Sequence, residues 1–282
     1  MLKSHAPKVL VTGATGFVGR QVMRALSELG AGLAPVVRSG KENLVEDLPN
    51  VERIVSTHDL FRESESWWAE QCHDVDIVIH VAWYAEPGKY LQASENLDCL
   101  IGSLILAKGV VKARVKRFVG IGTCIEYDLR HGVLSVETPI KPLTPYAGAK
   151  AALYWSLSQW LPAQSKEFVW CRLFYLYGEG EDKRRLVPYL RKQLEKGETA
   201  ELTNGKQIRD FLDVAEVGRK IACVALGSQV GPINICSGIP ITVRQLAERI
   251  ADEYGRRGLL KFGTRPDNLV DPPCIVGVSN ER

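Results

Sequence analysis

Hydrophobic residues form two kinds of pattern along the first two thirds of the chain: continuous runs and stretches with helical spacing. Short apolar runs rich in Val and Ile predict strands that are buried on both faces; they occupy residues 8–13, 33–38, 51–56, 75–83, 117–123 and 168–174. Between them lie stretches with apolar residues at helical spacing, at 16–29, 95–112 and 146–161. Strands that alternate with helices predict an α/β fold built on a doubly wound parallel sheet.

The pattern becomes less regular after Arg172. Helices are predicted at 187–197 and from Thr242 onward, where the threonine is a suitable N-cap, and a strand at 233–238. The tail from 263 to 282 is rich in Pro, Gly and Asp and is expected to be irregular. Because no long polar linker interrupts the chain, we expect one sheet domain with a smaller C-terminal lobe.

Composition excludes several classes of partner. The 282 residues are 45% hydrophobic and 24% charged, with a net charge of only +3 and basic residues scattered among acidic ones. Nucleic acid is therefore not expected as a partner. No apolar run reaches the roughly 18 residues of a membrane span, and glycines interrupt the N-terminal apolar stretch where a signal peptide needs an unbroken core. We expect a soluble, cytoplasmic protein without a membrane partner.

The seven cysteines are odd in number, widely spread and without a CxxC pair. This pattern is typical of reduced thiols in a core, not of disulfides or of metal ligands. No metal site is predicted.

Three glycines, Gly13, Gly16 and Gly19, separate the first predicted strand from the first helix. Such a turn lets phosphate oxygens approach the helix N-terminus, where free N–H groups and the helix dipole favour negative charge. The turn therefore predicts a dinucleotide site, with Thr15, Phe17 and Val18 as further cofactor contacts. A tight turn without a ligand is the alternative, because GxxGxxG spacing alone is weak evidence.

The end of the second predicted strand indicates which dinucleotide is bound. Arg38 and Ser39 stand where an acidic residue would accept hydrogen bonds from an adenosine ribose, and an arginine there can meet a 2′-phosphate. NADP(H) is therefore favoured, with NAD(H) possible if Arg38 faces solvent instead. Asp59 and Leu60, after the third strand, are placed to reach the adenine.

The stretch TPYAGAK, 144–150, carries the candidate chemistry. Tyr146 and Lys150 lie one helical turn apart, so they share a face. An ammonium near a phenol favours the phenolate and lowers the phenol's pKa, which suits proton exchange with a carbonyl or alcohol. Thr123, at the end of the fifth strand, can supply a second hydroxyl to the substrate oxygen. The alternative is a pair that only serves helix packing.

Four segments together, TGATGFVG, GIGTCIEYD, PYAGAK and IRDF, resemble the extended short-chain dehydrogenase/reductase family of nucleotide-sugar epimerases, dehydratases and reductases. The resemblance covers nearly the whole chain and implies a Rossmann-like sheet and a homodimer. It implies a dinucleotide-binding domain formed by 1–171 and 206–236, and a substrate-binding lobe formed by 172–205 and 237–282. It makes Thr123, Tyr146 and Lys150 catalytic and adds Val81, Ala82 and Asn96 to the cofactor site. It also implies that Arg209 and Arg265 contact the nucleotide part of the substrate.

Departures from the family pattern suggest the reaction. Family dehydratases carry Asp and Glu directly after the catalytic threonine, whereas this chain has Cys124 and Ile125, so dehydration is not expected. Cys124 could itself act as an acid or base, or be a buried thiol. Tyr175 replaces an asparagine usual in the epimerases, which implies a remodelled sugar site.

Trp83 and Tyr84, with Tyr90, either form an apolar wall for a deoxysugar or pack under a loop. The resulting prediction is NADPH-dependent 4-keto reduction of a nucleoside-diphosphate 4-keto-6-deoxyhexose. An NAD-dependent nucleotide-sugar 4-epimerase is the alternative. A non-catalytic NADP-binding sensor or scaffold is an alternative of another class.

The helix at 146–161 is apolar on more than one face, with Leu153, Trp155, Leu157 and Trp160 spread around it. It must therefore pack against more than its own sheet. The family pairs this face into a dimer interface; burial under the C-terminal lobe is the alternative.

Overall fold

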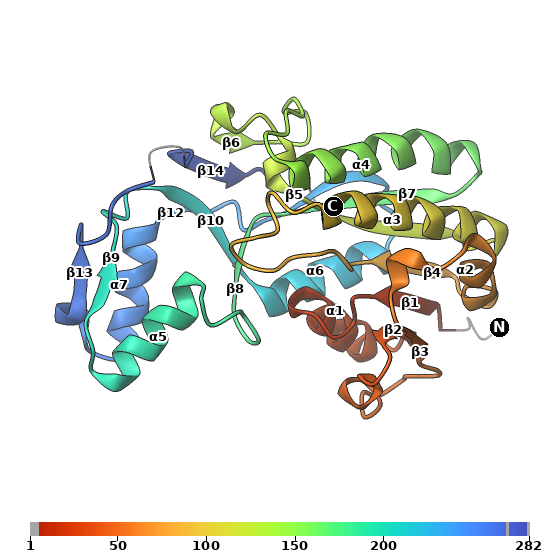
Figure 1. Ribbon diagram of the computed structural model, residues 1–282, viewed down its shortest axis with the longest axis horizontal. Coiled ribbons are helices and arrows are strands. Elements are labelled where there is room, and N and C mark those ends of the chain that lie inside the picture. Colours follow the sequence, from red (N-terminus) through yellow and green to blue (C-terminus); the bar gives the residue numbers. More distant parts are fainter. Residues whose placement is uncertain (1–5, 269–270, 281–282) are drawn as a thin grey trace.

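A seven-stranded, wholly parallel sheet forms the centre of the molecule, in the order β11-β7-β5-β4-β1-β2-β3 (Figure 1). The computed structural model describes residues 6–268 and 271–280. The strands of this sheet are β1 (Lys8–Thr12), β2 (Gly32–Arg38), β3 (Val55–Thr57), β4 (Ile77–His80), β5 (Arg117–Thr123), β7 (Glu167–Leu173) and β11 (Gly231–Ile235). The predicted doubly wound α/β fold is confirmed.

Helices cover both faces of this sheet, and each face has its own apolar core. One core gathers α1 (Phe17–Glu28) and α6 (Val214–Leu226). The other gathers α2 (Glu65–Gln71), α3 (Glu95–Lys112) and α4 (Pro145–Ala163). Strand order reverses between β1 and β4, so the connections that leave the carboxyl ends of these two strands run in opposite directions. In such sheets this reversal is where ligands bind.

The C-terminal lobe lies beside the carboxyl edge of the sheet (Figure 1). Its core is built by α5 (Leu186–Lys196), α7 (Val243–Glu253) and the paired strands β9 (Ala200–Leu202) and β13 (Leu260–Phe262). A five-stranded sheet connects the lobe to the main domain; it contains β6 (Val133–Leu134), β8 (Tyr175–Tyr177), β10 (Ile208–Asp213), β12 (Pro240–Thr242) and β14 (Cys274–Gly277). Short 3-10 segments occur at Glu42–Leu44 (η1), Leu60–Arg62 (η2), Cys124–Glu126 (η3), Leu129–His131 (η4) and Arg257–Leu259 (η5).

The structure corrects the predicted elements in two respects. The tail, expected to be irregular, contains β14, which pairs in parallel with β10 and β6. These partners are far away in sequence, so no local pattern reveals them. The strand predicted at 51–56 is reduced to β3, at 55–57, and the strand predicted at 75–83 is reduced to β4, at 77–80. Thr242 caps α7 as predicted, because its hydroxyl accepts from the Gln245 N–H at 3.0 Å.

The residues that the structure describes form no disulfide. None of the helices among them combines the length and apolarity needed to cross a bilayer.

Candidate active site

The start of α4 is fixed by local sequence. The Thr144 hydroxyl accepts a hydrogen bond from the Ala147 N–H at 3.2 Å, and Pro145 occupies the first helical position. The helix packs against β5, so that the Lys150 Nζ donates to the Ile121 carbonyl at 2.6 Å. Thr123 ends the same strand. The structure thus brings Thr123, Tyr146 and Lys150 together.

Burial acts on both titratable groups of this set. It raises the pKa of Tyr146; Tyr90, Glu126 and Cys124 add to the rise, and a hydrogen bond with Thr123 opposes it. This net direction is opposite to the lowering predicted from the Lys150 ammonium, because loss of hydration outweighs the favourable neighbours. Burial also lowers the pKa of Lys150 to about 7. Lys150 is therefore close to its own titration midpoint at neutral pH.

Glu126 is hydrogen-bonded to Thr123 of this set and was not assigned a role from sequence. Its Oε1 accepts from the Thr123 N–H at 2.8 Å, while the Thr123 hydroxyl caps η3 in return. Its Oε2 accepts from Arg172 Nε at 2.8 Å, and both oxygens accept from the Trp170 indole. The spacing T-x-x-E from Thr123 to Glu126 is the signature of a capping box and could have revealed the contact.

The glycine turn lies at the carboxyl end of β1. Gly13 has a φ of +69°, and a Cβ at this position would meet the Ala82 backbone N at 2.8 Å. A Cβ on Gly19 would meet the Gly13 carbonyl oxygen at 2.0 Å. Glycine is therefore required for the turn to pass close to β4 and α1. Gly16 is the N-cap of α1 and leaves the first N–H groups of the helix without a side-chain cap, so the turn suits the pyrophosphate of a dinucleotide.

The remaining predicted cofactor residues lie around this turn. Arg38 is exposed at the end of β2, and the Ser39 N–H donates to the Thr57 carbonyl at 2.9 Å. The Asp59 carboxylate caps the Phe61 N–H at 3.0 Å. The predicted contacts Thr15, Phe17, Val18 and Leu60 belong to the turn, the start of α1 and the start of η2. Their contact with a cofactor stays a prediction.

Asn96, predicted from the family resemblance as a cofactor contact, is hydrogen-bonded within the protein, and its contact with a cofactor stays a prediction. Its Oδ1 accepts from the Trp83 Nε1 at 2.9 Å, and its Nδ2 donates to the carbonyls of Tyr90 at 2.7 Å and Ala93 at 2.8 Å. The buried amide thus organises the 83–94 loop. The centre of the Trp83 ring lies 3.8 Å from the Lys150 Nζ. Val81 and Ala82 come just before Trp83 and lie beside Gly13 of the glycine turn. Sequence reasoning did not anticipate the Trp83–Lys150 contact.

A cleft of about 420 Å³ lies between the 83–94 loop and the C-terminal lobe; the side chains that line it include Tyr90, Tyr175, Glu181, Arg185, Arg209 and Asp271. Arg209 pairs with Asp271 at 2.7 Å, and its guanidinium lies 5.2 Å from the centre of the Tyr175 ring. Burial raises the pKa of Glu181 to about 7.

Four predicted substrate residues, Trp83, Tyr84, Thr123 and Arg265, are outside the lining of this cleft. The Arg265 guanidinium lies 4.8 Å from the centre of the Tyr189 ring, and the Tyr84 hydroxyl donates to Glu86 at 3.2 Å.

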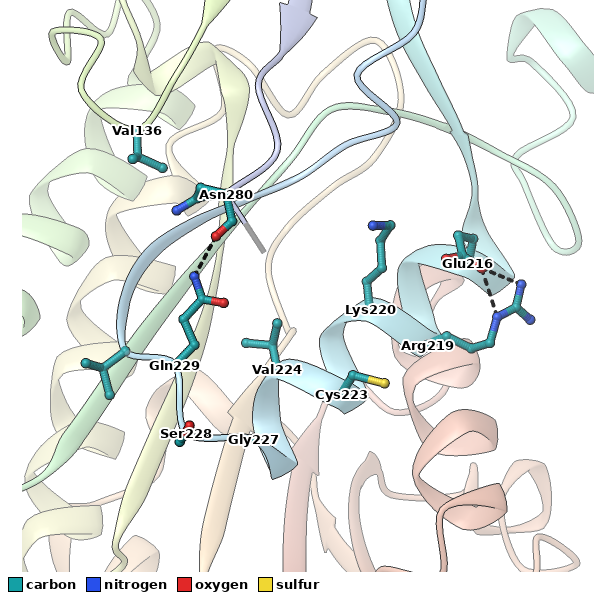
Figure 2. Close-up of a pocket in the computed structure, with 11 residues that line it drawn as sticks. Val136, Glu216, Arg219, Lys220, Cys223, Val224, Gly227, Ser228, Gln229 and Asn280 are labelled. Atoms are coloured by element: carbon teal, nitrogen blue, oxygen red, sulfur yellow. Dashed lines mark hydrogen bonds and ion pairs between the residues drawn. The ribbon is translucent and has the colours of Figure 1, made fainter. Parts of the chain in front are cut away.

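A larger hollow of about 1190 Å³ lies elsewhere, over α6 and the loop that leads to β11 (Figure 2). In it Gln229 donates to the Asn280 carbonyl at 2.8 Å, and Arg219 pairs with Glu216. Its lining includes none of the residues predicted for the cofactor or the substrate, whereas the smaller cleft includes Tyr175 and Arg209. The described residues contain no cluster of His, Cys, Asp and Glu that could hold a metal ion.

This chain resembles known proteins in both sequence and fold. The model of the NAD dependent epimerase/dehydratase family matches residues 9–236. The chain is 22% identical over 271 residues to dTDP-6-deoxy-L-talose 4-dehydrogenase (NAD(+)) of Aggregatibacter actinomycetemcomitans, covering 95% of this chain and 98% of that one. It is 27% identical over 266 residues to dTDP-glucose 4,6-dehydratase of Streptomyces niveus, covering 88% and 78%.

The fold is also that of a solved relative. UDP-N-acetylglucosamine 4-epimerase from Methanobrevibacter ruminantium superimposes with a TM-score of 0.85 at 22% identity, covering 98% of this chain and 90% of that one. The chain therefore belongs to the NAD dependent epimerase/dehydratase family and is an enzyme of the extended short-chain dehydrogenase/reductase type.

Proposed function

We propose that this enzyme transfers hydride at C4 of a nucleoside-diphosphate 6-deoxyhexose, in the direction of 4-keto reduction. The observation that carries the proposal is the meeting of Thr123, Tyr146 and Lys150 beside the glycine turn. The talose relative is named as a 4-dehydrogenase of a dTDP-6-deoxyhexose, which supports the choice of carbon atom.

Each residue has a distinct role in the proposed reaction. Tyr146 gives its proton to the carbonyl oxygen that becomes the C4 hydroxyl, and Thr123 hydrogen-bonds the same oxygen. Lys150, when charged, favours the phenolate that remains on Tyr146. Gly13, Gly16 and the start of α1 would hold the cofactor pyrophosphate. A bound nicotinamide supplies the hydride.

The cleft supplies the expected binding groups for the rest of the substrate. Arg209 would meet the diphosphate, since a guanidinium binds phosphate oxygens in a bidentate manner. Tyr90 and Tyr175 border the same cleft and offer aromatic faces to a deoxysugar. We infer that the sheet domain formed by 1–171 and 206–236 binds the cofactor, and that 172–205 and 237–282 bind the substrate.

Residues after Thr123 argue against dehydration, the activity named for the Streptomyces relative. Cys124 is buried, and this burial raises the pKa of its thiol to about 12, which keeps it protonated. Ile125 cannot exchange protons. Glu126 is buried and already bonded to Arg172 and Trp170. No group at these positions is available as the second acid or base that dehydration needs.

The decisive test is an assay of purified protein with NADPH or NADH and a set of nucleoside-diphosphate 4-keto-6-deoxyhexoses. Stoichiometric oxidation of the reduced cofactor is expected. Tyr146→Phe should reduce kcat by at least about 100-fold, the scale of acid–base catalysis, while it still binds cofactor. Conversion of a UDP-hexose to its 4-epimer without net cofactor oxidation would support the epimerase instead. Indifference of every activity to Tyr146→Phe would indicate a sensor or scaffold.

We further propose that NADP(H) is the preferred cofactor, although the talose dehydrogenase relative is named for NAD(+). Arg38 is exposed at the end of β2, where a 2′-phosphate would lie. Arg38→Ala should weaken NADPH binding by about tenfold or more, since a hydrogen bond to a charged group contributes about 1.5–3 kcal/mol. NADH binding should stay unchanged; equal weakening of both cofactors would contradict the proposal.

We also propose a homodimer formed through α3 and α4. These helices lie side by side on one face of the sheet (Figure 1). They expose Leu97, Ile101 and Trp155 at 62%, 57% and 52% of their full areas. Large apolar side chains gathered on adjacent helices are typical of a protein–protein interface.

A further inference from the structure

The environment of Lys150 is unusually poor in counter-charges. The side chain is 2% exposed, and its Nζ donates to one carbonyl, that of Ile121. No carboxylate forms an ion pair with it within the described residues. An ammonium in such a place loses its hydration, so its charged form needs another source of stabilisation.

The face of the Trp83 indole supplies that stabilisation. The Lys150 Nζ lies 3.8 Å from the centre of the ring, within the distance at which the negative face of an aromatic ring attracts a cation. Indole is the strongest of the natural aromatic partners in this interaction. A second indole, that of Trp170, is more distant at 6.0 Å.

The indole is held in place from the other side by Asn96. The Trp83 Nε1 donates to the Asn96 Oδ1, and the amide group of Asn96 is oriented by the carbonyls of Tyr90 and Ala93. Edge-on contacts with Phe61 and Tyr146, at 6.5 and 6.4 Å between ring centres, complete the surroundings. Rotation of the ring away from Lys150 would break the hydrogen bond and both contacts.

We propose that Trp83 is a positioning residue whose indole, fixed by Asn96, keeps the Lys150 ammonium charged and aimed along the face that carries Tyr146. This inference rests on the proposed function for its catalytic meaning, though not for its geometry. It changes the expected role of two residues: Trp83 acts on the lysine and not on the sugar, and Asn96 acts on Trp83 and not on the cofactor.

Other titratable groups around Lys150 belong to four elements. The Glu126 carboxylate of η3 favours the charged lysine. Burial raises the pKa of Cys99 on α3 to about 11, so this thiol is neutral in the range where Lys150 titrates. His80 of β4 is neutral at physiological pH, because burial lowers its pKa to about 3. Tyr146 lies on α4 itself. Removing the Trp83 ring leaves all of these in place, so a change in the titration of Lys150 reports on the ring.

The test is a direct titration of Lys150 in the full chain labelled with 13C-lysine, followed by NMR at the Cε position and assigned by the signal lost in Lys150→Arg. Trp83→Leu should move the midpoint down by about one pH unit. Trp83→Phe keeps an aromatic face and should titrate near the wild type. Trp67→Leu, on α2 and without a contact to Lys150 among those described, is the matched control and should titrate as the wild type.

A midpoint in Trp83→Leu equal to that of the wild type overturns the proposal. If circular dichroism shows that Trp83→Leu does not fold, Asn96→Ala decides: loss of the anchor should lower the midpoint by a smaller amount, and an unchanged midpoint overturns the proposal. A pH profile of kcat/KM, measured for the same variants, separates the positioning role of Trp83 from the proposed function. If the midpoint moves but no variant alters any ketosugar reduction, the positioning role stands and the proposed function fails.

Discussion

At the residue scale, Glu126 is the buried charge that holds the turn between β5 and η3. It holds the Thr123 N–H and neutralises Arg172 in a fully buried ion pair. Glu126→Ala would leave the Arg172 charge buried and uncompensated, which should lower the free energy of unfolding by about 3–5 kcal/mol. Urea denaturation followed by circular dichroism measures this loss. Exposed Glu137 is the matched control, and Glu137→Ala should stay within about 0.5 kcal/mol of the wild type.

A second prediction at this scale concerns the pH dependence of stability. The pKa of Lys150 is lowered from 10.5 to about 7 in the folded state. Between pH 7 and 10 the unfolded chain binds a proton there that the folded chain does not, so stability rises with pH across this window; below pH 7 the penalty of the buried charge is fully present.

Comparison with Lys150→Met isolates this effect, because methionine does not titrate. From pH 7 to pH 9.5 the free energy of unfolding of the wild type should rise by roughly 3 kcal/mol more than that of the variant, at about 1.4 kcal/mol per pH unit. The two proteins are compared by urea denaturation at each pH. Parallel curves would show that Lys150 titrates in the folded protein as it does in the unfolded chain.

At the scale of the element, the first turn of α1 and the first turn of α4 offer a paired test of glycine. A Cβ on Gly19 would press into the Gly13 carbonyl at 2.0 Å, whereas a Cβ on Gly148 would meet nothing within 4 Å. Gly19→Ala should therefore destabilise the protein by about 1–3 kcal/mol and weaken cofactor binding, since α1 must shift.

Gly148→Ala should instead stabilise α4 by about 0.5–1 kcal/mol, because alanine loses less backbone entropy in a helix. Thermal unfolding of both variants provides the comparison. Similar melting temperatures for the two variants would mean that the close contact between the glycine turn and α1 is not maintained in solution.

The same scale shows which elements a sequence can predict. The start of α4 follows from Thr144 and Pro145, and the start of α7 from Thr242, because a cap is a contact between residues three positions apart. β14 could not be predicted in this way, since its hydrogen bonds go to strands more than sixty residues away. Its sequence, CIVG, is too short for periodicity to outweigh the Pro and Asp around it.

At the scale of the whole molecule, the candidate active site combines contacts predictable from motifs with others that need the tertiary fold. Motifs predicted Thr123, Tyr146 and Lys150 as one set, and the structure brings the three together, while their catalytic role stays a prediction. The motifs gave no sign that Trp83 covers the lysine, because that contact requires the loop after β4 to fold back over α4. The sequence predicted a lowered pKa for Tyr146, and this direction was wrong for the same reason. Burial, which raises the pKa, depends on everything that packs around the phenol.

The last prediction concerns assembly. Ile101 lies on α3, the helix that packs beside α4, and 57% of its area is exposed. In the proposed dimer this side chain is buried against the partner, so Ile101→Asp would place a charge in an apolar interface and should dissociate it. The wild type should sediment as a dimer at micromolar concentration and the variant as a monomer.

Ile239→Asp is the matched control. Ile239 is 61% exposed in the loop before β12, away from α3 and α4, so its charge should leave the dimer intact. The loss should also be specific to association, because a surface charge on one exposed position changes folding stability by no more than about 0.5 kcal/mol. A wild-type protein that sediments as a monomer at all concentrations would contradict the α3–α4 interface, as would an Ile101→Asp variant that remains dimeric.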